Sequence, residues 1–230
     1  MHSHNYRLPQ PFKDQVVVVI GSSASAVDIS RDISGFAKDV HVASWSNPAD
    51  TFIKQNGYTN IWMHSMYHFP FLETNGEVTV DDNCVGPLYK HVFPPALAPS
   101  LSFVGIPYKV LPFPMFELQS KWIAGVLSGR IKLPSKEDMM VETKTMKATF
   151  EGLGIPKRFT HCLGIDQFEY YDWLGSQIGC SGTEEWRKEM SLPIFMRKMK
   201  HPESYRDEWE DHHLVAQAYQ DFSLYISPKR

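Results

Sequence analysis

Cysteine is scarce in this sequence of 230 residues. Only Cys84, Cys162 and Cys180 are present, an odd number with no close pair. A disulfide framework needs paired cysteines, and a zinc site needs cysteine or histidine ligands at short, regular spacing, so neither is expected. Cysteines without disulfides are typical of a reducing compartment, and the polar residues 1–7 lack the apolar stretch of a signal peptide. We therefore predict a cytoplasmic protein.

Long apolar runs and an excess of one charge are lacking too. The apolar stretches at residues 16–20 and 122–127 are far too short to cross a bilayer. The 26 acidic and 23 basic side chains give a formal net charge of −3, which offers no broad attraction for nucleic acid or an anionic membrane. We expect neither as a partner. The 43% of hydrophobic residues are enough for the core of one large domain or two small ones.

A compact strand–helix–strand pattern lies near the start of the chain. Residues 16–20 are a continuous β-branched run, typical of a strand that is buried on both faces of a parallel sheet. Residues 24–36 show the apolar spacing of a helix, and residues 40–43 read as a second short strand. The pattern predicts the first βαβ unit of a doubly wound α/β sheet.

The turn between the first strand and the helix carries the strongest chemical signal. Small residues at this place let backbone N–H groups and the positive end of the helix dipole point at one spot, which suits a pyrophosphate. Compared with the G-x-G-x-x-G pattern, Ser23 replaces the second glycine and Ala26 the third. Plain βαβ packing without a ligand is an open alternative. The predicted cofactor-binding residues of the turn are Gly21, Ser22, Ser23, Ala24, Ser25 and Ala26.

The end of the second strand indicates which cofactor the turn would bind. NAD sites place a carboxylate there to hold the ribose 2′-hydroxyl, but residues 43–46 read Ala-Ser-Trp-Ser. The hydroxyls of Ser44 and Ser46 suit a 2′-phosphate, although no arginine accompanies them. We therefore predict NADP, with Ser44 as a further binding residue.

The rest of the chain reads as loops followed by helices. We expect mostly loop with one short helix at 45–66, an aromatic loop or strand at 67–72, a hairpin-like turn at 74–76 and a strand at 101–104. The expected helices begin near Pro114, after a capping box at Ser135, at 169–175, at 184–190 and at 203–225. The inward face of the first should carry Met115, Leu118, Trp122 and Val126, and that of the last Tyr205, Trp209, Leu214, Ala218 and Phe222.

These residues carry a family resemblance. HSHNYR at 2–7, VVVVIGSSASAVDISRDI at 16–33 and VHVAS at 40–44 resemble the flavin-containing monooxygenases, particularly the plant glucosinolate S-oxygenase type. The family fingerprint FxGxxxHxxx(Y/F) closes with a histidine and an aromatic residue, which His2 and Tyr6 match. The resemblance continues through YHFPFLETNG at 67–76, the whole of 86–130, and the stretches QFEYYDWL and YRDEWEDHHLVAQAY.

The resemblance implies an α/β fold and a flavin-dependent monooxygenase of the N,N-dimethylaniline monooxygenase type. Residues 1–72 would be a truncated Rossmann-type NADP-binding portion, and residues 73–230 a C-terminal remnant of a doubly wound FAD-binding domain with a helical tail. The family uses NADPH, FAD and oxygen to oxygenate sulfur or nitrogen in small molecules such as thioethers or amines. Most of that chemistry belongs to the cofactors, so no catalytic residue is predicted.

Glu117 and Gln119 lie in a region that the family places near the flavin. The alternative for both is an ordinary acidic first turn of a helix, which stabilises the helix through its dipole.

The sequence departs from the family pattern at three places. The family's FAD-binding G-x-G-x-x-G would precede Met1, a segment that ends in a C-T-G-Y type motif is missing between Met66 and Tyr67, and Trp45 stands where an arginine usually holds the 2′-phosphate. We therefore expect a truncated enzyme with an internal deletion. The alternative is a non-catalytic NADP-binding or interaction protein derived from the family.

Histidines suggest no further site. The HxH of His2 and His4 and the pair His212 and His213 read as solvated side chains, and no metal is predicted. Cys162 follows His161, but neighbours in a chain rarely face each other, so no Cys–His nucleophile is predicted either.

Overall fold

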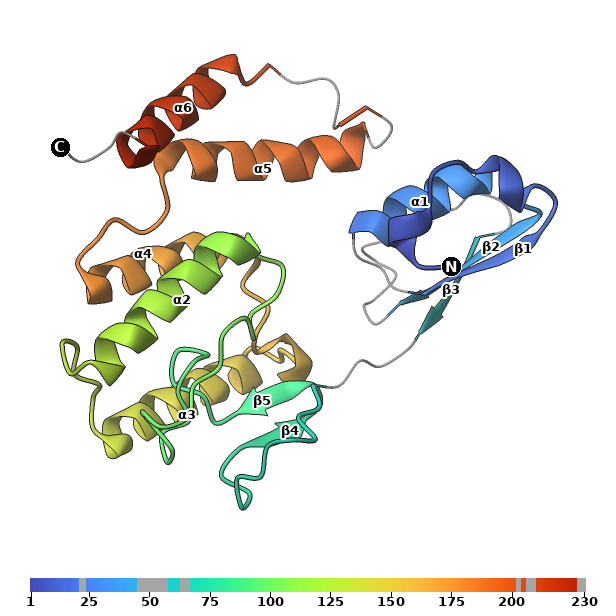
Figure 1. Cartoon of the computed structure of the whole chain (residues 1–230). Helices are drawn as coiled ribbons and strands as arrows, with labels where there is room; N and C mark the ends of the chain where they lie inside the picture. The colour runs from blue at the N-terminus through green and yellow to red at the C-terminus, as the bar shows by residue number, and fades with distance from the viewer. Residues whose placement is uncertain (21–23, 45–57, 63–66, 202–203, 206–209, 227–230) are drawn as a thin grey trace. The chain divides into compact units, whose positions relative to one another are not determined.

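The computed structural model describes residues 1–20, 24–44, 58–62, 67–201, 204–205 and 210–226 (Figure 1). The chain divides into two compact units, Met1–Met66 and Tyr67–Arg230, whereas the sequence placed the boundary after residue 72. Among the described residues, no helix is both long and apolar enough to cross a membrane. The architecture is mixed α/β with small sheets.

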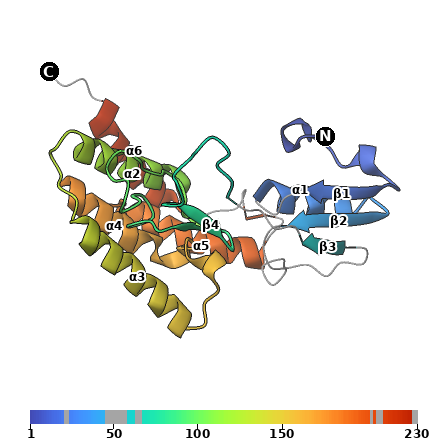
Figure 2. The same cartoon turned by 90° about the horizontal axis from the view of Figure 1, so that it is seen from below.

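Unit 1 is built on a parallel three-stranded sheet. Its strands are β1 (Val16–Ile20), β2 (Asp39–Ser44) and β3 (Tyr58–Trp62), in the order β1-β2-β3 (Figure 2). Helix α1 (Ala24–Ser34) joins β1 to β2, and two 3-10 turns, η1 (Ser3–Asn5) and η2 (Gln10–Phe12), precede the sheet. The predicted βαβ unit is confirmed, with Val18 opposite His41 in the parallel register.

Strand β1 is covered on one face only, although its β-branched run predicted burial on both. Val16, Val18 and Ile20 are 57%, 55% and 72% exposed, whereas Val17 and Val19 pack into the core of unit 1. The prediction was wrong because, among the described residues of unit 1, one layer alone packs against the sheet. This core combines Ile33, Val40 and Val42 with Tyr6, Phe12, Val17, Val19, Ile29 and Ala37.

Strand β3 was not predicted. Asn56 and Gly57 are turn formers and favoured a loop over 45–66, yet residues 58–62 pair in parallel with β2, from Val40 opposite Tyr58 to Ser44 opposite Trp62. The sequence Tyr-Thr-Asn-Ile-Trp is rich in strand formers, and the free edge of β2 supplies the hydrogen-bonding partners that such a segment needs. The remaining residues of 45–66 lie outside the described part of the chain.

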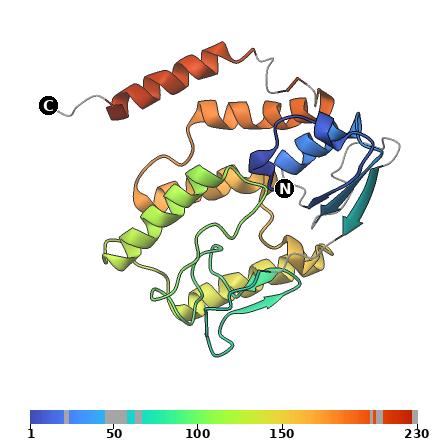
Figure 3. The same cartoon turned by 45° about the vertical axis from the view of Figure 1, so that its right-hand side comes forward.

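Unit 2 consists of helices and a short hairpin. The hairpin strands are β4 (Thr79–Asp81) and β5 (Cys84–Gly86), and the helices are α2 (Pro112–Leu127), α3 (Lys136–Gly152), α4 (Gln167–Ile178), α5 (Glu185–Lys200) and α6 (His212–Ile226). Two 3-10 turns, η4 (Lys157–Phe159) and η5 (Gly164–Asp166), connect α3 to α4. Helix α2 packs against α4, and α5 against α6 (Figure 3).

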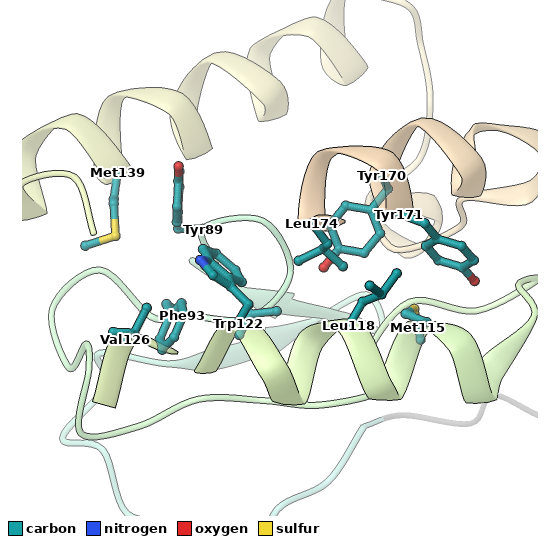
Figure 4. Packing of buried hydrophobic residues seen from close by; sticks show 11 residues of the cluster. Tyr89, Phe93, Met115, Leu118, Trp122, Val126, Met139, Tyr170, Tyr171 and Leu174 are labelled. Carbon is teal, nitrogen blue, oxygen red and sulfur yellow. The ribbon is translucent and has the colours of Figure 1, made fainter. Parts of the chain in front are cut away.

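The predicted face of α2 forms the main core of unit 2. Met115, Leu118, Trp122 and Val126 are all at least nine-tenths buried, and the side chains of α4 pack onto them (Figure 4). The ring of Trp122 lies 4.9 Å from that of Phe93 and 5.1 Å from that of Trp173, measured between centroids.

The predicted capping box at the start of α3 is confirmed in its N-cap half, while the Asp138 carboxylate binds the Ser135 hydroxyl in place of a backbone N–H. The Ser135 hydroxyl oxygen accepts a hydrogen bond from the Asp138 backbone N–H at 3.1 Å, and the hydroxyl donates to the Asp138 carboxylate at 2.7 Å. Both bonds satisfy polar groups of the first turn, which explains why α3 begins at Lys136.

The expected turn at 74–76 is present: the backbone N–H of Glu77 donates to the carbonyl of Thr74 at 2.9 Å, and Asn75 and Gly76 have φ values of 50° and 82°. It precedes β4, whereas Asp82 and Asn83, with φ values of 46° and 57°, form the two-residue turn that joins β4 to β5. One expectation about extended structure in unit 2 was wrong. Residues 101–104 form no strand, since no neighbouring strand offers them a ladder and Phe103 alone donates to the carbonyl of Val92, at 2.9 Å.

The last two helices differ in length from the prediction. Helix α5 extends to Lys200 with Pro193 inside it, and α6 begins at His212 instead of residue 203. Leu214 is buried as expected, but Phe222 is 47% exposed. Trp209 lies outside the described residues.

Truncating Trp122 should destabilise unit 2 strongly. The Trp122→Ala change removes a side chain that is 1% exposed and leaves a cavity, so we expect a loss of about 3–5 kcal/mol in unfolding free energy. Urea denaturation followed by circular dichroism measures this loss. Phe113→Ala, on the same helix but 80% exposed, is the control and should cost much less. Equal losses for the two variants would contradict this packing.

Candidate nucleotide-binding site

The candidate site lies where β1 leads into α1. Because β1 and β2 are parallel, the N-terminus of α1 lies at the carboxyl end of β1, where dinucleotides bind in such folds. Gly21, Ser22 and Ser23 lie outside the described residues. Ala24 is the first residue of α1.

The first turn of α1 suits an anion. It contains no acidic side chain, so nothing opposes the positive end of the helix dipole. Ser25 is exposed and Ala26 is half-buried, and both are small enough to let a phosphate approach the backbone N–H groups. Ser44 is the last residue of β2, where dinucleotide-binding folds contact the ribose; its role here stays a prediction, and Trp45 lies outside the described residues. The described residues therefore fit the pyrophosphate of a dinucleotide.

The two fingerprint residues lie in the segment that packs beside α1. Nδ1 of His2 accepts a hydrogen bond from the backbone N–H of His4 at 3.1 Å. The Tyr6 hydroxyl donates to the carboxylate of Asp32 on α1, and its ring stacks on that of Phe12 at 6.0 Å. Desolvation and the neighbouring Asp32 carboxylate raise the pKa of Tyr6 above its usual value. The fingerprint is thus tied to the helix that follows the turn.

Gln119 lies in the core of unit 2. Its side chain is fully buried; Oε1 accepts from the backbone N–H of Gly105 and Nε2 donates to the Tyr170 hydroxyl, both at 2.9 Å. The Tyr170 hydroxyl donates in turn to the carbonyl of Lys90 at 2.8 Å. Gln119 therefore holds together three segments of unit 2. A position near a flavin stays a prediction for it.

Glu117 faces in another direction, although it is only two residues from Gln119. It is exposed and pairs with Lys121 one turn further along α2, with 2.6 Å between Oε1 and Nζ. Such an exposed pair within one helix contributes only a few tenths of a kcal/mol. The structure therefore does not bring the two candidate flavin-proximal side chains together.

A buried histidine pair escaped the sequence analysis. His91 and His161 are 7% and 1% exposed, and their Nδ1 atoms lie 3.0 Å apart. Seventy residues separate them, and no spacing rule connects histidines so far apart. His212 and His213 are exposed, and within the described ranges no three His, Cys, Asp or Glu side chains gather as a metal site.

Removing the Tyr6 hydroxyl should loosen α1. We expect Tyr6→Phe to destabilise unit 1 by about 0.5–1.5 kcal/mol, because Asp32 loses its donor. Mass spectrometry of amide hydrogen exchange should show faster exchange in residues 24–34. Tyr219→Phe, at a side chain that is 73% exposed, is the control. Unchanged exchange in the Tyr6 variant would show that the bond does not hold the helix.

One family model and several known proteins are similar to this chain. The family model "Flavin-binding monooxygenase-like" matches residues 46–184, more than half of the chain. Flavin-containing monooxygenase FMO GS-OX-like 3 of Arabidopsis thaliana is 66% identical over 98% of this chain and 57% of its own length. FMO GS-OX5 of the same plant is 50% identical over 96% of this chain and 55% of its own length. The solved S-allyl-L-cysteine S-oxygenase of Allium sativum is 54% identical, with a TM-score of 0.82 over 97% of this chain and 58% of that one.

This chain is shorter than the relatives with which it aligns. The chain spans a little more than half the length of the curated relatives it matches. The alignment with GS-OX-like 3 is 255 residues long, which exceeds the 230 residues of the whole chain. The relative therefore has residues inside the aligned region that this chain lacks, in line with the predicted internal deletion. Its position between Met66 and Tyr67 stays a prediction.

The family model, the identities of 50% or more and the similar solved structure lead to one conclusion: this chain belongs to the flavin-containing monooxygenase family, with the plant S-oxygenases among its relatives.

Proposed function

We propose that this chain carries the NADP-binding unit and part of the flavin domain of a monooxygenase that oxygenates the sulfur of small thioethers. The observation that carries the proposal is the parallel β1–α1–β2 unit, whose helix begins with small residues and no carboxylate. The similar solved protein is an S-allyl-L-cysteine S-oxygenase, which supports a thioether as the substrate class.

In the reaction, one atom of O₂ goes to sulfur to form the sulfoxide, and the other leaves as water with the hydride of NADPH and a proton. Bound FAD and NADPH supply the redox chemistry, and the protein binds and orients them. The backbone N–H groups at Ala24, Ser25 and Ala26 would hold the pyrophosphate, and Ser44 would contact the 2′-phosphate. No side chain of this chain needs to act as an acid or base.

A second candidate is a non-catalytic NADP-binding protein derived from the family. Two observations favour it. Trp45 stands at the position where an arginine is expected for the 2′-phosphate, and the outer face of β1 is exposed within unit 1. This candidate predicts nucleotide binding without turnover.

Two measurements, stabilisation by NADP and oxidation of NADPH, distinguish the monooxygenase from the non-catalytic NADP-binding protein. NADP at a hundredfold excess over its dissociation constant should stabilise the purified chain by about 2.7 kcal/mol. Thermal unfolding with NADP, and with NAD as the comparison, measures this. NADPH oxidation in the presence of FAD and S-allyl-L-cysteine then tests the oxygenase. Stabilisation without NADPH oxidation would leave only the second candidate, and no stabilisation by millimolar NADP would contradict both.

A carboxylate in the first turn of α1 should affect folding and binding in opposite ways. Ser25→Glu should stabilise the chain without ligand by about 0.3–1 kcal/mol, because it complements the helix dipole. It should weaken NADP binding by roughly 1 kcal/mol, about fivefold in dissociation constant, because it repels the pyrophosphate. Titration calorimetry measures the binding, and Ser25→Gln is the neutral control. An unchanged dissociation constant for Ser25→Glu would place the pyrophosphate elsewhere.

A further inference from the structure

Two buried imidazole rings of unit 2 share a single hydrogen bond. The Nδ1 atoms of His91 and His161 are 3.0 Å apart, and the rings meet edge to face at 72° with their centroids 5.2 Å apart. At this distance one Nδ1 must carry a proton and the other must not. The neutral pair therefore holds one proton between the two rings.

The far side of His161 is bonded to β5. Its Nε2 lies 3.1 Å from the backbone nitrogen of Val85 and 3.0 Å from the carbonyl oxygen of the same residue. A protonated Nε2 donates to the carbonyl, and an unprotonated one accepts from the N–H. Either neutral tautomer of His161 is thus satisfied, and the two rings link the segment at 161 to β5 and to the turn at Lys90 and His91.

That turn is closed by backbone hydrogen bonds between Tyr89 and Phe93, at 2.7 and 3.1 Å, and is held further by tertiary contacts. Lys90 and His91 have φ values of 49° and 62°, in the left-handed region that side chains with a Cβ rarely adopt. Two such residues in succession persist only where the surroundings hold them. Here the Tyr170 hydroxyl donates to the carbonyl of Lys90, and His91 bonds to His161.

Among the described residues, no carboxylate bonds to either ring, so a positive charge there would have no counter-ion from them. Within the described part of the chain, the polar partners of the two rings are each other, the Val85 backbone and the Cys84 thiol, whose sulfur lies 3.9 Å from Nε2 of His161. The ring of Tyr67 meets that of His161 edge on, and the ring of Tyr170 meets that of His91.

The charge of Lys90 adds to the cost of protonating His91. Lys90 precedes His91 and forms its own ion pair with Glu142 of α3. Burial, with His161 and Lys90 as neighbours, lowers the pKa of His91 to about 3. Burial likewise lowers the pKa of His161 to about 4, although its bond to Val85 opposes the shift.

We propose that His91 and His161 form an acid-sensitive latch, which joins the Lys90–His91 turn to β5 and to the segment at 161 and opens when the pair takes up protons. A second proton would point two N–H groups at each other across 3.0 Å, so the doubly protonated pair cannot keep this geometry. Opening removes one of the tertiary contacts that hold the Lys90–His91 turn.

The direction of the pH dependence follows from linkage. An unfolded histidine takes up a proton below about pH 6.5, whereas the folded pair resists protonation until about pH 4. The contribution of the latch to the free energy of unfolding is therefore fully present above pH 6.5 and is lost as the pH falls from 6.5 towards 4.

Urea unfolding of the full chain at pH 7.5 and pH 5.0 tests the latch. The fluorescence of Trp122 and Trp173, which lie in the core of unit 2, reports the transition. Acidification from pH 7.5 to pH 5.0 should raise the unfolding equilibrium constant by roughly 30-fold for each of the two histidines.

Two variants complete this test. His91→Asn keeps a polar group near the position of Nδ1 but does not titrate, so the rise in its unfolding equilibrium constant between the two pH values should be roughly 30-fold smaller. The exposed His68 provides the control, and His68→Asn should behave as the unaltered chain. Equal acid sensitivity of His91→Asn and the unaltered chain would overturn the latch.

A measurement on the unaltered chain covers the case in which His91→Asn does not fold. The chain has ten histidines, and NMR of their ring carbons follows each one through its titration. The latch requires that the rings of His91 and His161 show no titration between pH 7.5 and pH 5. If all ten titrate near pH 6.5, the latch does not exist.

Discussion

The packing of Trp122 between Phe93 and Trp173 is the contact on which the rest of unit 2 depends. The three rings come from α2, from the segment after β5 and from α4, so one aromatic cluster joins parts of the chain up to eighty residues apart. It orients α2 and thereby directs Gln119 inward, towards Gly105 and Tyr170. The polar network and the histidine pair rest on this arrangement, because both lie beside segments that the aromatic cluster holds.

Unit 1 depends on a different constraint, the parallel pairing of β1 with β2. This pairing requires a crossover, and α1 supplies it. The crossover brings the N-terminus of α1 to the carboxyl end of β1, which is the geometric condition for binding a pyrophosphate. The nucleotide site at this position stays a proposal, while the exposed outer face of β1 shows that the described part of unit 1 covers its sheet from one side only.

Elements with local signals could be predicted, and those that depend on distant partners could not. The apolar spacing of α2 and the cap at Ser135 are local, and both expectations are confirmed. Strand β3 exists because β2 offers it an edge, and residues 101–104 remain a loop because no edge is available to them. For the candidate nucleotide-binding site, too, local features could be predicted and contacts between distant segments could not. The small residues after β1 and the missing carboxylate at Ser44 are visible in the sequence, whereas the tie between Tyr6 and Asp32 needs the fold to bring the two together.

The sequence by itself determined the family and the βαβ unit, because motifs and helical periodicity are properties of neighbouring residues. Only the tertiary structure decided that Gln119 is a fully buried link, that Glu117 faces solvent, and that His91 meets His161. The physical reason is that burial and hydrogen bonding between distant segments depend on how helices pack. Packing removes the two imidazole rings from water, and this lowers their pKa values below that of a histidine in solvent.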